Sequence, residues 1–225
     1  MESGRLRWYN RSAVNTRKNG SLTLENVGKA FGARRVLGSV SLTMEPGDVV
    51  AVTGRNGSGK STLLKIVAGL LRPTQGAVRL SGAGKILDTA QRRRAVGYAA
   101  PDLALYDELT GRENLSFFAR VRGGGRLNGA ETERRLTEVG LGGRGDDLVR
   151  AYSSGMRQRL RLAFALLAEP RLLLLDEPSL ALDESGVALV ENIVGRQKAD
   201  GGLTLLATND KNEAALGERV VVLGG

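Results

Sequence analysis

The sequence predicts an α/β fold with a mainly parallel sheet and crossover helices, an antiparallel β portion at the N-terminus and a helical subdomain in the middle. Two short apolar runs, Val49–Val52 and Leu172–Leu175, are typical of strands buried on both faces. A Gly-rich loop and a helical pattern follow the first run. Beyond the second run, helix and strand patterns alternate, which indicates parallel pairing through crossover helices.

The N-terminal part is expected to contain a tail and two strands. Residues 1–20 are polar, basic and aperiodic, which predicts a flexible tail and a single domain over 21–225. Strands are expected at Leu22–Val27 and Val40–Met44, where the alternation of apolar residues has a period of two. A turn is expected at Pro46–Gly47.

The middle of the chain, from about 88 to 168, is expected to be mostly helical, and the helical subdomain is placed at about 95 to 168. Gly123–Gly125 interrupts the pattern, and Ser153 or Ser154 is the expected N-cap of the last helix. The predicted helices lie at Glu113–Arg120, Ala130–Val139, Ser153–Ala168 and Gly186–Arg196, and the later strands at Leu172–Leu175, Thr204–Ala207 and Val220–Leu223.

The composition restricts the available chemistry. A chain of 225 residues, 41% of them hydrophobic, is large enough for one compact domain with a core. It contains no Cys and no His, which excludes disulfides, thiolate metal sites and imidazole catalysis. Carboxylates, Lys, hydroxyls, amides and the backbone remain. The lack of Cys also fits a reducing cytosol.

The net charge of +9 has two explanations, nucleic-acid binding or a phosphate-binding protein near an anionic membrane surface. Much of the excess lies in residues 1–20 and in Arg92–Arg94. The most apolar stretch, Leu160–Leu175, contains Arg161 and other breaks, so no spanning helix is expected, and no secretory signal either. If the protein serves a membrane, another chain supplies the membrane part.

The Gly-rich loop matches a phosphate-binding loop, or P-loop. Glycines let backbone N–H groups turn toward phosphate oxygens, and the helix predicted at Ser61–Leu71 adds positive potential. Lys60 is expected at the β- and γ-phosphates and the Ser61 hydroxyl at Mg²⁺. A chance match in a Gly-rich chain is the alternative, but the preceding strand and following helix favour a P-loop NTPase core. The matched residues are Gly54, Arg55, Asn56, Gly57, Ser58, Gly59, Lys60, Ser61 and Thr62.

Two acids at the end of the apolar run Leu172–Leu175 are expected to complete this site. Asp176 would join the Mg²⁺ shell, through water. Glu177 would polarise the attacking water as a general base. A strand that ends in two acids is by itself usually a solvated strand end. Its combination with the P-loop favours the catalytic interpretation.

A turn of small residues, Ser153-Ser154-Gly155, opens the last predicted helix of the subdomain. Such a turn offers hydroxyls, a close backbone approach and a helix N-terminus to a γ-phosphate. Alone it would be an ordinary capped helix, but it lies 21 residues before Asp176. With the two earlier motifs, Tyr152–Leu160 resembles the signature sequence of the ATP-binding-cassette (ABC) ATPases, in a Ser-Ser-Gly-Met form. The resemblance extends over Leu22–Leu223.

The resemblance implies an ABC ATPase fold that binds ATP and Mg²⁺ and hydrolyses ATP. Two cassettes would close around two ATP molecules, as a homodimer or with a second ABC subunit, so that the 153–155 turn contacts the opposite ATP. They would drive a transmembrane permease at the cytoplasmic face of the cell membrane, without nucleic acid. Pro178–Asp183 resembles the family's D-loop, with Asp183 near the dimer seam. Phe31, 23 residues before Gly54, corresponds to the adenine-stacking aromatic, unless it is a core residue.

Two residues depart from the family pattern. Where the family has a Gln near Mg²⁺, this chain has Ala99-Ala100-Pro101-Asp102, and Asp102 is the candidate substitute ligand. Asn209 replaces the switch His that contacts the γ-phosphate. Since Asn can donate a hydrogen bond but is shorter, we expect normal ATP binding and dimerisation with slower hydrolysis. A degenerate cassette that only switches on ATP binding is the alternative, against which Glu177 argues.

The partner and cargo are predicted from resemblance alone. The segment Leu103–Tyr106, together with Leu115, Phe117 and Phe118, is expected in part to receive helices of the permease and in part to fill the core. Exporter cassettes are most similar, above all those of the haem exporter of cytochrome c maturation, with drug, lipid or polysaccharide exporters as alternatives. DNA-repair cassettes need long coiled coils, but only about 114 positions separate Thr62 from Asp176. Translation-factor cassettes normally have two such domains.

Overall fold

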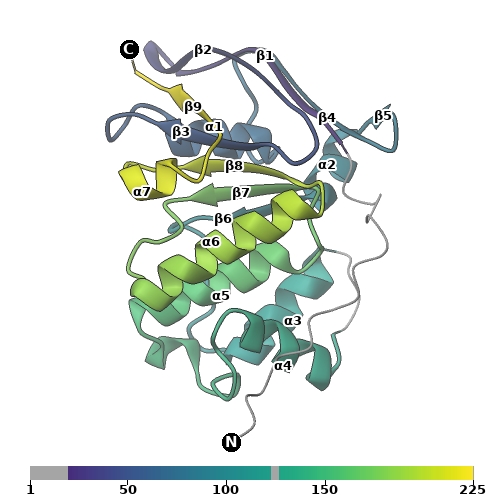
Figure 1. Ribbon diagram of the computed structural model, residues 1–225, viewed down its shortest axis with the longest axis vertical. Coiled ribbons are helices and arrows are strands. Elements are labelled where there is room, and N and C mark those ends of the chain that lie inside the picture. Colours follow the sequence, from purple (N-terminus) through teal and green to yellow (C-terminus); the bar gives the residue numbers. More distant parts are fainter. Residues whose placement is uncertain (1–19, 123–126, 225) are drawn as a thin grey trace, which may run out of the picture.

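The computed structural model describes residues 20–122 and 127–224. The expected tail at 1–20, except its last residue, and the expected break at Gly123–Gly125 therefore lie outside the described residues. The elements stack in layers along the longest axis of the molecule (Figure 1), with an antiparallel sheet at one end and helices at the other.

The antiparallel sheet has the strand order β2-β1-β4-β5. Leu22 on β1 lies opposite Met44 on one neighbour and Leu80 on the other, and all three side chains are buried. Strand β1 is longer than the sequence pattern predicts, because register shifts between β1 and β2 interrupt the period of two beyond Leu24. The strands of this sheet are β1 (Leu22–Phe31), β2 (Arg34–Met44), β4 (Gln75–Gly82) and β5 (Lys85–Ile86).

The second sheet is parallel, in the order β6-β7-β8-β3-β9. Its three central strands, β7, β8 and β3, are buried almost throughout, as their apolar runs predict. The carboxyl ends of parallel strands meet at one edge of a sheet, and the loops after β3, β7 and β8 leave from that edge. The strands are β3 (Val49–Thr53), β6 (Val96–Ala99), β7 (Leu172–Asp176), β8 (Leu203–Ala207) and β9 (Arg219–Val222).

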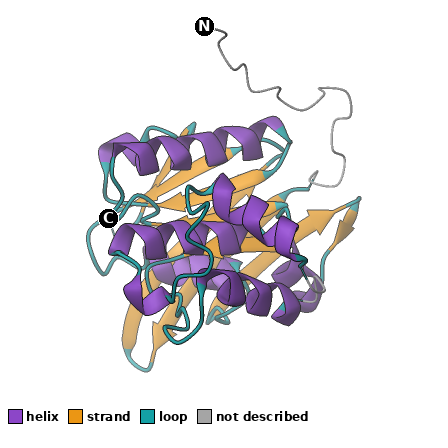
Figure 2. Ribbon diagram, turned by 90° about the horizontal axis from the view of Figure 1, so that it is seen from below, coloured by secondary structure: helices purple, strands orange, loops and turns teal. Residues whose placement is uncertain are grey.

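Helices cover both faces of the parallel sheet. Buried residues of α1 pack with both sheets in one core cluster, whereas α3 to α6 form a second cluster on the other face. Seen from the helical end in Figure 2, the helices lie across the strands. The helices are α1 (Lys60–Val67), α2 (Thr89–Ala95), α3 (Gly111–Val121), α4 (Gly129–Glu138), α5 (Ser154–Leu166), α6 (Glu184–Ala199) and α7 (Lys211–Ala214), with a 3-10 turn at Val149–Ala151.

The predicted boundary of the helical subdomain, at about 95, is placed too early. The structure has the buried strand β6 at Val96–Ala99, paired with β7 in the parallel sheet. Four residues without alternation, Val96-Gly97-Tyr98-Ala99, show no period, so their sequence alone does not separate a strand from a buried helix. Within the described part of the chain, no helix has the length and apolar character that a membrane crossing requires.

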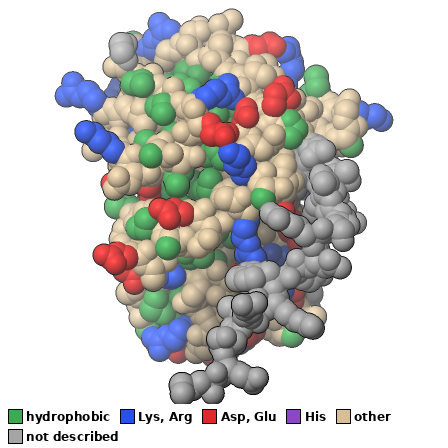
Figure 3. All heavy atoms as spheres, viewed as in Figure 1, with side chains coloured by type: hydrophobic (Ala, Val, Ile, Leu, Met, Phe, Trp, Pro, Cys, Tyr) green, Lys and Arg blue, Asp and Glu red, His purple; other side chains and the backbone are tan. Residues whose placement is uncertain are grey.

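The charges on the face seen in Figure 3 are mixed. Lys, Arg, Asp and Glu side chains lie between one another over the described surface, and no large region of that face has one sign. The net charge of +9 therefore does not appear on this face as one basic patch.

Candidate nucleotide site

The loop from β3 to α1 requires glycine at two positions. Gly54 and Gly59 have φ angles of 143° and 99°. A Cβ atom at Gly54 would lie 2.4 Å from the Leu223 carbonyl oxygen, and one at Gly59 would lie 2.8 Å from the Val36 carbonyl oxygen. The loop can therefore pass this close to the neighbouring backbone only because these two positions have no side chain.

This loop also has the features of an anion cradle. The residue before α1, Gly59, supplies no side-chain cap to the first turn of the helix. The Ser58 hydroxyl is buried without a hydrogen-bond partner, and space within 4 Å of a Cβ at Gly57 is open. An uncapped helix N-terminus with a free hydroxyl beside it fits phosphate oxygens.

Lys60 connects the loop to the segment that follows β8. Its side chain is only 7% exposed. The Nζ atom donates to the Gly54 carbonyl oxygen and to Asn209 Oδ1, each at 2.8 Å. A buried ammonium held by exchangeable neutral acceptors is ready to bind phosphate oxygens instead.

Asp176 and Ser61 meet where β7 ends beside the start of α1. Asp176 is 3% exposed, and burial raises the pKa of its carboxyl, while a hydrogen bond from the Ser61 hydroxyl lowers it. One carboxylate and one hydroxyl form a donor set that fits Mg²⁺, which usually takes its other ligands from phosphates and water. In the described residues, no cluster of three or more acids suits a metal ion.

Asp102 lies near this pair but has another partner. Its carboxylate is one of the charges that raise the pKa of Asp176. It forms an ion pair with Lys65 Nζ at 2.6 Å, and its side chain is 59% exposed. Its assignment as a Mg²⁺ ligand stays a prediction.

Glu177 lies one residue beyond Asp176 with a φ angle of 45°, which is uncommon for a residue with a side chain. Its N–H donates to the Ala207 carbonyl oxygen at 2.8 Å. Its Oε2 accepts from the Thr208 hydroxyl at 3.3 Å and the Asn209 N–H at 3.4 Å. Burial is the main cause that raises the pKa of Glu177, and the charge of Glu213 raises it further.

Asn209 connects the three segments of this site. Its Oδ1 accepts from Lys60, its Nδ2 donates to Asn56 Oδ1 at 2.5 Å, and its N–H donates to Glu177. The residue in the predicted switch position thus contacts both the phosphate loop and the candidate base. Thr208 and Glu213 also belong here, and the sequence analysis missed both because neither lies in a recognisable motif.

The Ser153–Gly155 turn lies elsewhere. Ser153 is the N-cap of α5, and its hydroxyl accepts from the Met156 N–H at 3.1 Å. Gly155 lies against the Ala181 carbonyl. Asp183, two residues beyond Ala181, caps α6 and accepts from Arg159 at 3.0 Å. Among the described hydrogen bonds, none joins residues 153–155 to the loop at 54–62.

Phe31 is not a core residue. It ends β1 and is 52% exposed, with Lys29 Nζ 4.8 Å from the centre of its ring. The exposed ring excludes the core alternative and leaves a face available for stacking.

Known proteins are similar to this chain in sequence. Residues 37–180 match the family described as ABC transporter. The chain is 37% identical over 206 residues to the daunorubicin resistance ATP-binding protein DrrA3 of Streptomyces coeruleorubidus, covering 90% of this chain and 65% of that protein. It is also 37% identical over 208 residues to the sulfate/thiosulfate import ATP-binding protein CysA of Thermosynechococcus vestitus, covering 90% and 61%.

A solved structure shows the same fold. The dimeric post-hydrolysis state of the ATP-binding cassette MJ0796, bound to ADP and Pi, has a TM-score of 0.79 at 29% identity, covering 90% of this chain and 94% of that one. The chain spans 65% and 66% of the length of two of its curated relatives.

Proposed function

This chain belongs to the ABC transporter family as its ATP-binding cassette, an ATPase domain, and from that premise we propose that it binds ATP with Mg²⁺, hydrolyses it as half of a dimer and drives a membrane permease. The observation that supports the proposal best is the meeting of Lys60, Glu177 and Asn209, from three separate segments, beside the Ser61–Asp176 pair.

Each residue has a separate task in the proposed reaction. Lys60 exchanges neutral acceptors, among them the Gly54 carbonyl and Asn209, for oxygens of the β- and γ-phosphates. Ser61 and Asp176 hold Mg²⁺, which neutralises phosphate charge when bound. Glu177 accepts the proton of the attacking water. Burial raises the pKa of its carboxyl toward neutral pH, where a general base works best. Asn209 donates to the γ-phosphate. Phe31 stacks on adenine.

The site is proposed to be complete only in a dimer, as a homodimer or with a second ABC subunit. The Ser153–Gly155 turn has no described bond to the phosphate loop of its own chain, and one solved relative is dimeric. The turn of one cassette would then contact the ATP of the other.

The test is the Glu177→Gln variant of the full chain with Mg-ATP. Hydrolysis is expected to fall about 10²–10⁴-fold, as for loss of a general base. ATP should remain bound, so light scattering should show a dimer that dissociates when ATP is removed. A variant that is saturated with Mg-ATP and stays monomeric, even with its permease, would contradict the proposal.

The permease is proposed to dock on an aromatic cluster formed by Tyr106, Phe117, Phe118 and Phe164. Tyr106 and Phe117 lie 4.9 Å apart edge to face, and Tyr106 is 49% exposed. Leu115 is fully buried and fills the core instead. Docking there would hold the chain at the cytoplasmic face of the membrane.

Export is the proposed direction, because one relative is named for daunorubicin resistance. Another relative is named for sulfate/thiosulfate import. The relatives named above offer no support for the haem-exporter subtype, and the permease sets the cargo. The test is to express the chain with the permease of its neighbouring genes and to measure substrate movement in inside-out vesicles.

A further inference from the structure

The peptide group between Pro178 and Ser179 lies one residue beyond Glu177, and two buried side chains bond to it from opposite sides. Its carbonyl accepts from Gln158 Nε2 at 3.0 Å. Its N–H donates to Glu213 Oε1 at 2.7 Å. Gln158 is 2% exposed and Glu213 is 6% exposed. Both polar ends of this single peptide group are therefore fixed by side chains from distant segments, α5 and α7.

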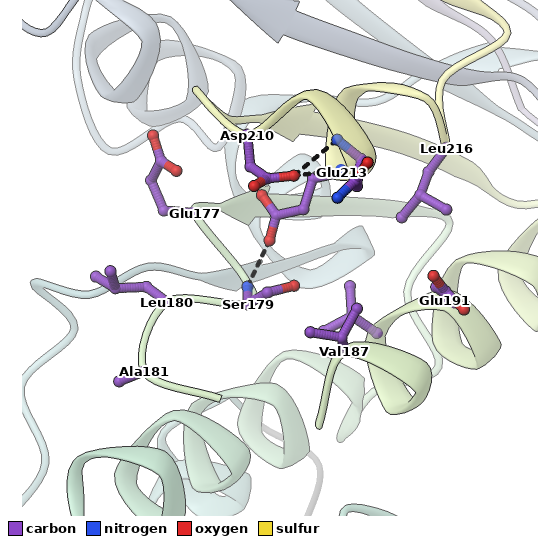
Figure 4. A pocket seen from close by; sticks show the side chains of 11 residues that line it. Glu177, Ser179, Leu180, Ala181, Val187, Glu191, Asp210, Glu213 and Leu216 are labelled. Carbon is purple, nitrogen blue, oxygen red and sulfur yellow. Dashed lines mark hydrogen bonds between the residues drawn. The ribbon is translucent and has the colours of Figure 1, made fainter. Parts of the chain in front are cut away.

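The Gln158 side chain has a second partner, and the backbone of Glu213 is fixed at the start of α7. Gln158 Oε1 accepts from Arg161 at 3.4 Å, which defines the orientation of the amide. The backbone N–H of Glu213 donates to Oδ1 of Asp210 at 3.0 Å, and Asp210 is the residue that caps α7 (Figure 4). The second oxygen of Glu213, Oε2, is buried without a hydrogen-bond partner. A buried carboxylate that is only partly satisfied is costly, which calls for a role beyond stability.

Hydrogen bonds and the backbone between them form a closed ring that contains Glu177 and Glu213. The Asp210 N–H donates to Thr208 Oγ1 at 2.9 Å, and this hydroxyl donates to Glu177 Oε2. The carboxylate of Glu177 is thus held by the segment before α7, and the second peptide group after Glu177 is held by α5 and α7. The positive φ angle of Glu177, 45°, needs such support from its surroundings.

We propose that Gln158 and Glu213 are positioning residues that clamp the Pro178–Ser179 peptide and so hold Glu177 in line with the attacking water. Glu213 acts as a hydrogen-bond acceptor and Gln158 as a donor. This inference rests on the proposed function, in which Glu177 is the base. An error of about 1 Å in a catalytic group costs roughly 10²-fold in rate, so loosening of the clamp affects turnover more than ATP binding.

The experiment compares purified full-length variants by phosphate release, ATP affinity and melting temperature. Glu213→Met removes the acceptor at similar size, whereas Glu213→Gln keeps it. Glu213 and Glu191 both line a pocket of about 360 Å³ (Figure 4). Because Glu191 is exposed, Glu191→Met is the matched control. Glu213→Met is expected to lower kcat about 10- to 100-fold with KM within threefold. Glu213→Gln should stay within threefold of the wild type, and Glu191→Met should be unchanged.

Three results would overturn the clamp: an unchanged kcat in Glu213→Met, the same loss in Glu213→Gln, or a rise in KM equal to the fall in kcat. If Glu213→Met does not fold, Gln158→Met decides by the same criteria, since it removes the donor from the other side. Glu177→Gln, measured in parallel, separates the two proposals. If Glu177→Gln hydrolyses ATP at the full rate, Glu177 is not the base and the proposed function is rejected. If Glu177→Gln is inactive as expected but Glu213→Met has a normal rate, only the clamp is rejected.

Discussion

At the scale of single residues, Asn209 is the most informative difference from related cassettes. Its amide connects Lys60 to the loop residue Asn56, and its N–H donates to Glu177. The sequence resemblance assigns it to the position of the family's switch His. A neutral His ring donates from a nitrogen that extends farther from the backbone than the Asn amide does. In the proposed site, the shorter Asn side chain would therefore leave a longer gap to the γ-phosphate.

Asn209→His is therefore expected to raise the hydrolysis rate of the assembled transporter. One improved hydrogen bond in the transition state, worth about 1.4 kcal/mol, corresponds to roughly tenfold. The measurement is steady-state phosphate release, and Asn209→Ala, which should be slower than the wild type, is the control. A turnover that does not rise with His would reject the idea of a slow site.

Asp176 is expected to reduce stability at neutral pH, because burial raises its pKa in the folded protein. A raised folded pKa means that stability from this group is present below the unfolded pKa of about 3.9 and is lost as pH rises through the folded value. Asp176→Asn should therefore melt at a higher temperature than the wild type at pH 7, and this difference should shrink toward pH 4.

Thermal denaturation at both pH values, without nucleotide, measures this difference. Glu191→Gln removes an exposed carboxylate and is the control, so its melting temperature should follow that of the wild type at each pH. An Asp176→Asn variant that is less stable than the wild type at pH 7 would show that the carboxylate contributes more through Ser61 than its burial costs.

At the scale of elements, the shape of the phosphate loop depends on Gly54 and Gly59, which have positive φ angles and lie against backbone carbonyls. Gly59→Ala is expected to destabilise the fold by about 1–3 kcal/mol, since its φ is 99° and its Cβ would meet a backbone carbonyl. Gly195→Ala, in the open middle of α6, is the control and should stabilise by about 0.5–1 kcal/mol. Urea denaturation measures both. An unchanged free energy of unfolding in Gly59→Ala would mean that the loop adapts easily.

Elements with a clear period or strong end signals could be predicted, and those without them could not. The predicted α3, α4 and α5 agree with the structure within about two residues, because apolar spacing and capping residues define them. The strands β4, β5 and β6 and the short helices α2 and α7 were missed. β4 is half exposed and starts at Gln75-Gly76, and α7 has only four residues, so neither has a recognisable pattern.

At the scale of the whole molecule, the proposed dimer makes each site dependent on two chains. Lys60→Ala should inactivate the site on its own chain, and Gly155→Asp should inactivate the site on the opposite chain. A mixed dimer of the two variants keeps one intact site and loses the other. Mixing the inactive variants should therefore restore measurable hydrolysis, whereas each alone should be inactive.

The measurement is phosphate release against mixing ratio, with a maximum expected near equal amounts. Restored hydrolysis would not occur if each chain completed its own site, because every chain in the mixture contains one inactivating change. A mixture that is no more active than its components would thus reject the composite site.

The sequence alone was sufficient to predict the family and the α/β fold class of this protein. The phosphate loop, the two acids after Leu172–Leu175 and the α/β fold class all follow from short contiguous patterns, because the loop and strand-end chemistry depends on residues close in the chain. Tertiary structure decided what depends on distant segments: the contact of Asn209 with Lys60, the exposure of Phe31, and the grip of Gln158 and Glu213 on one peptide group. These partners lie 20 to 149 residues apart in the chain, so only the packing of the sheet and helices brings them together.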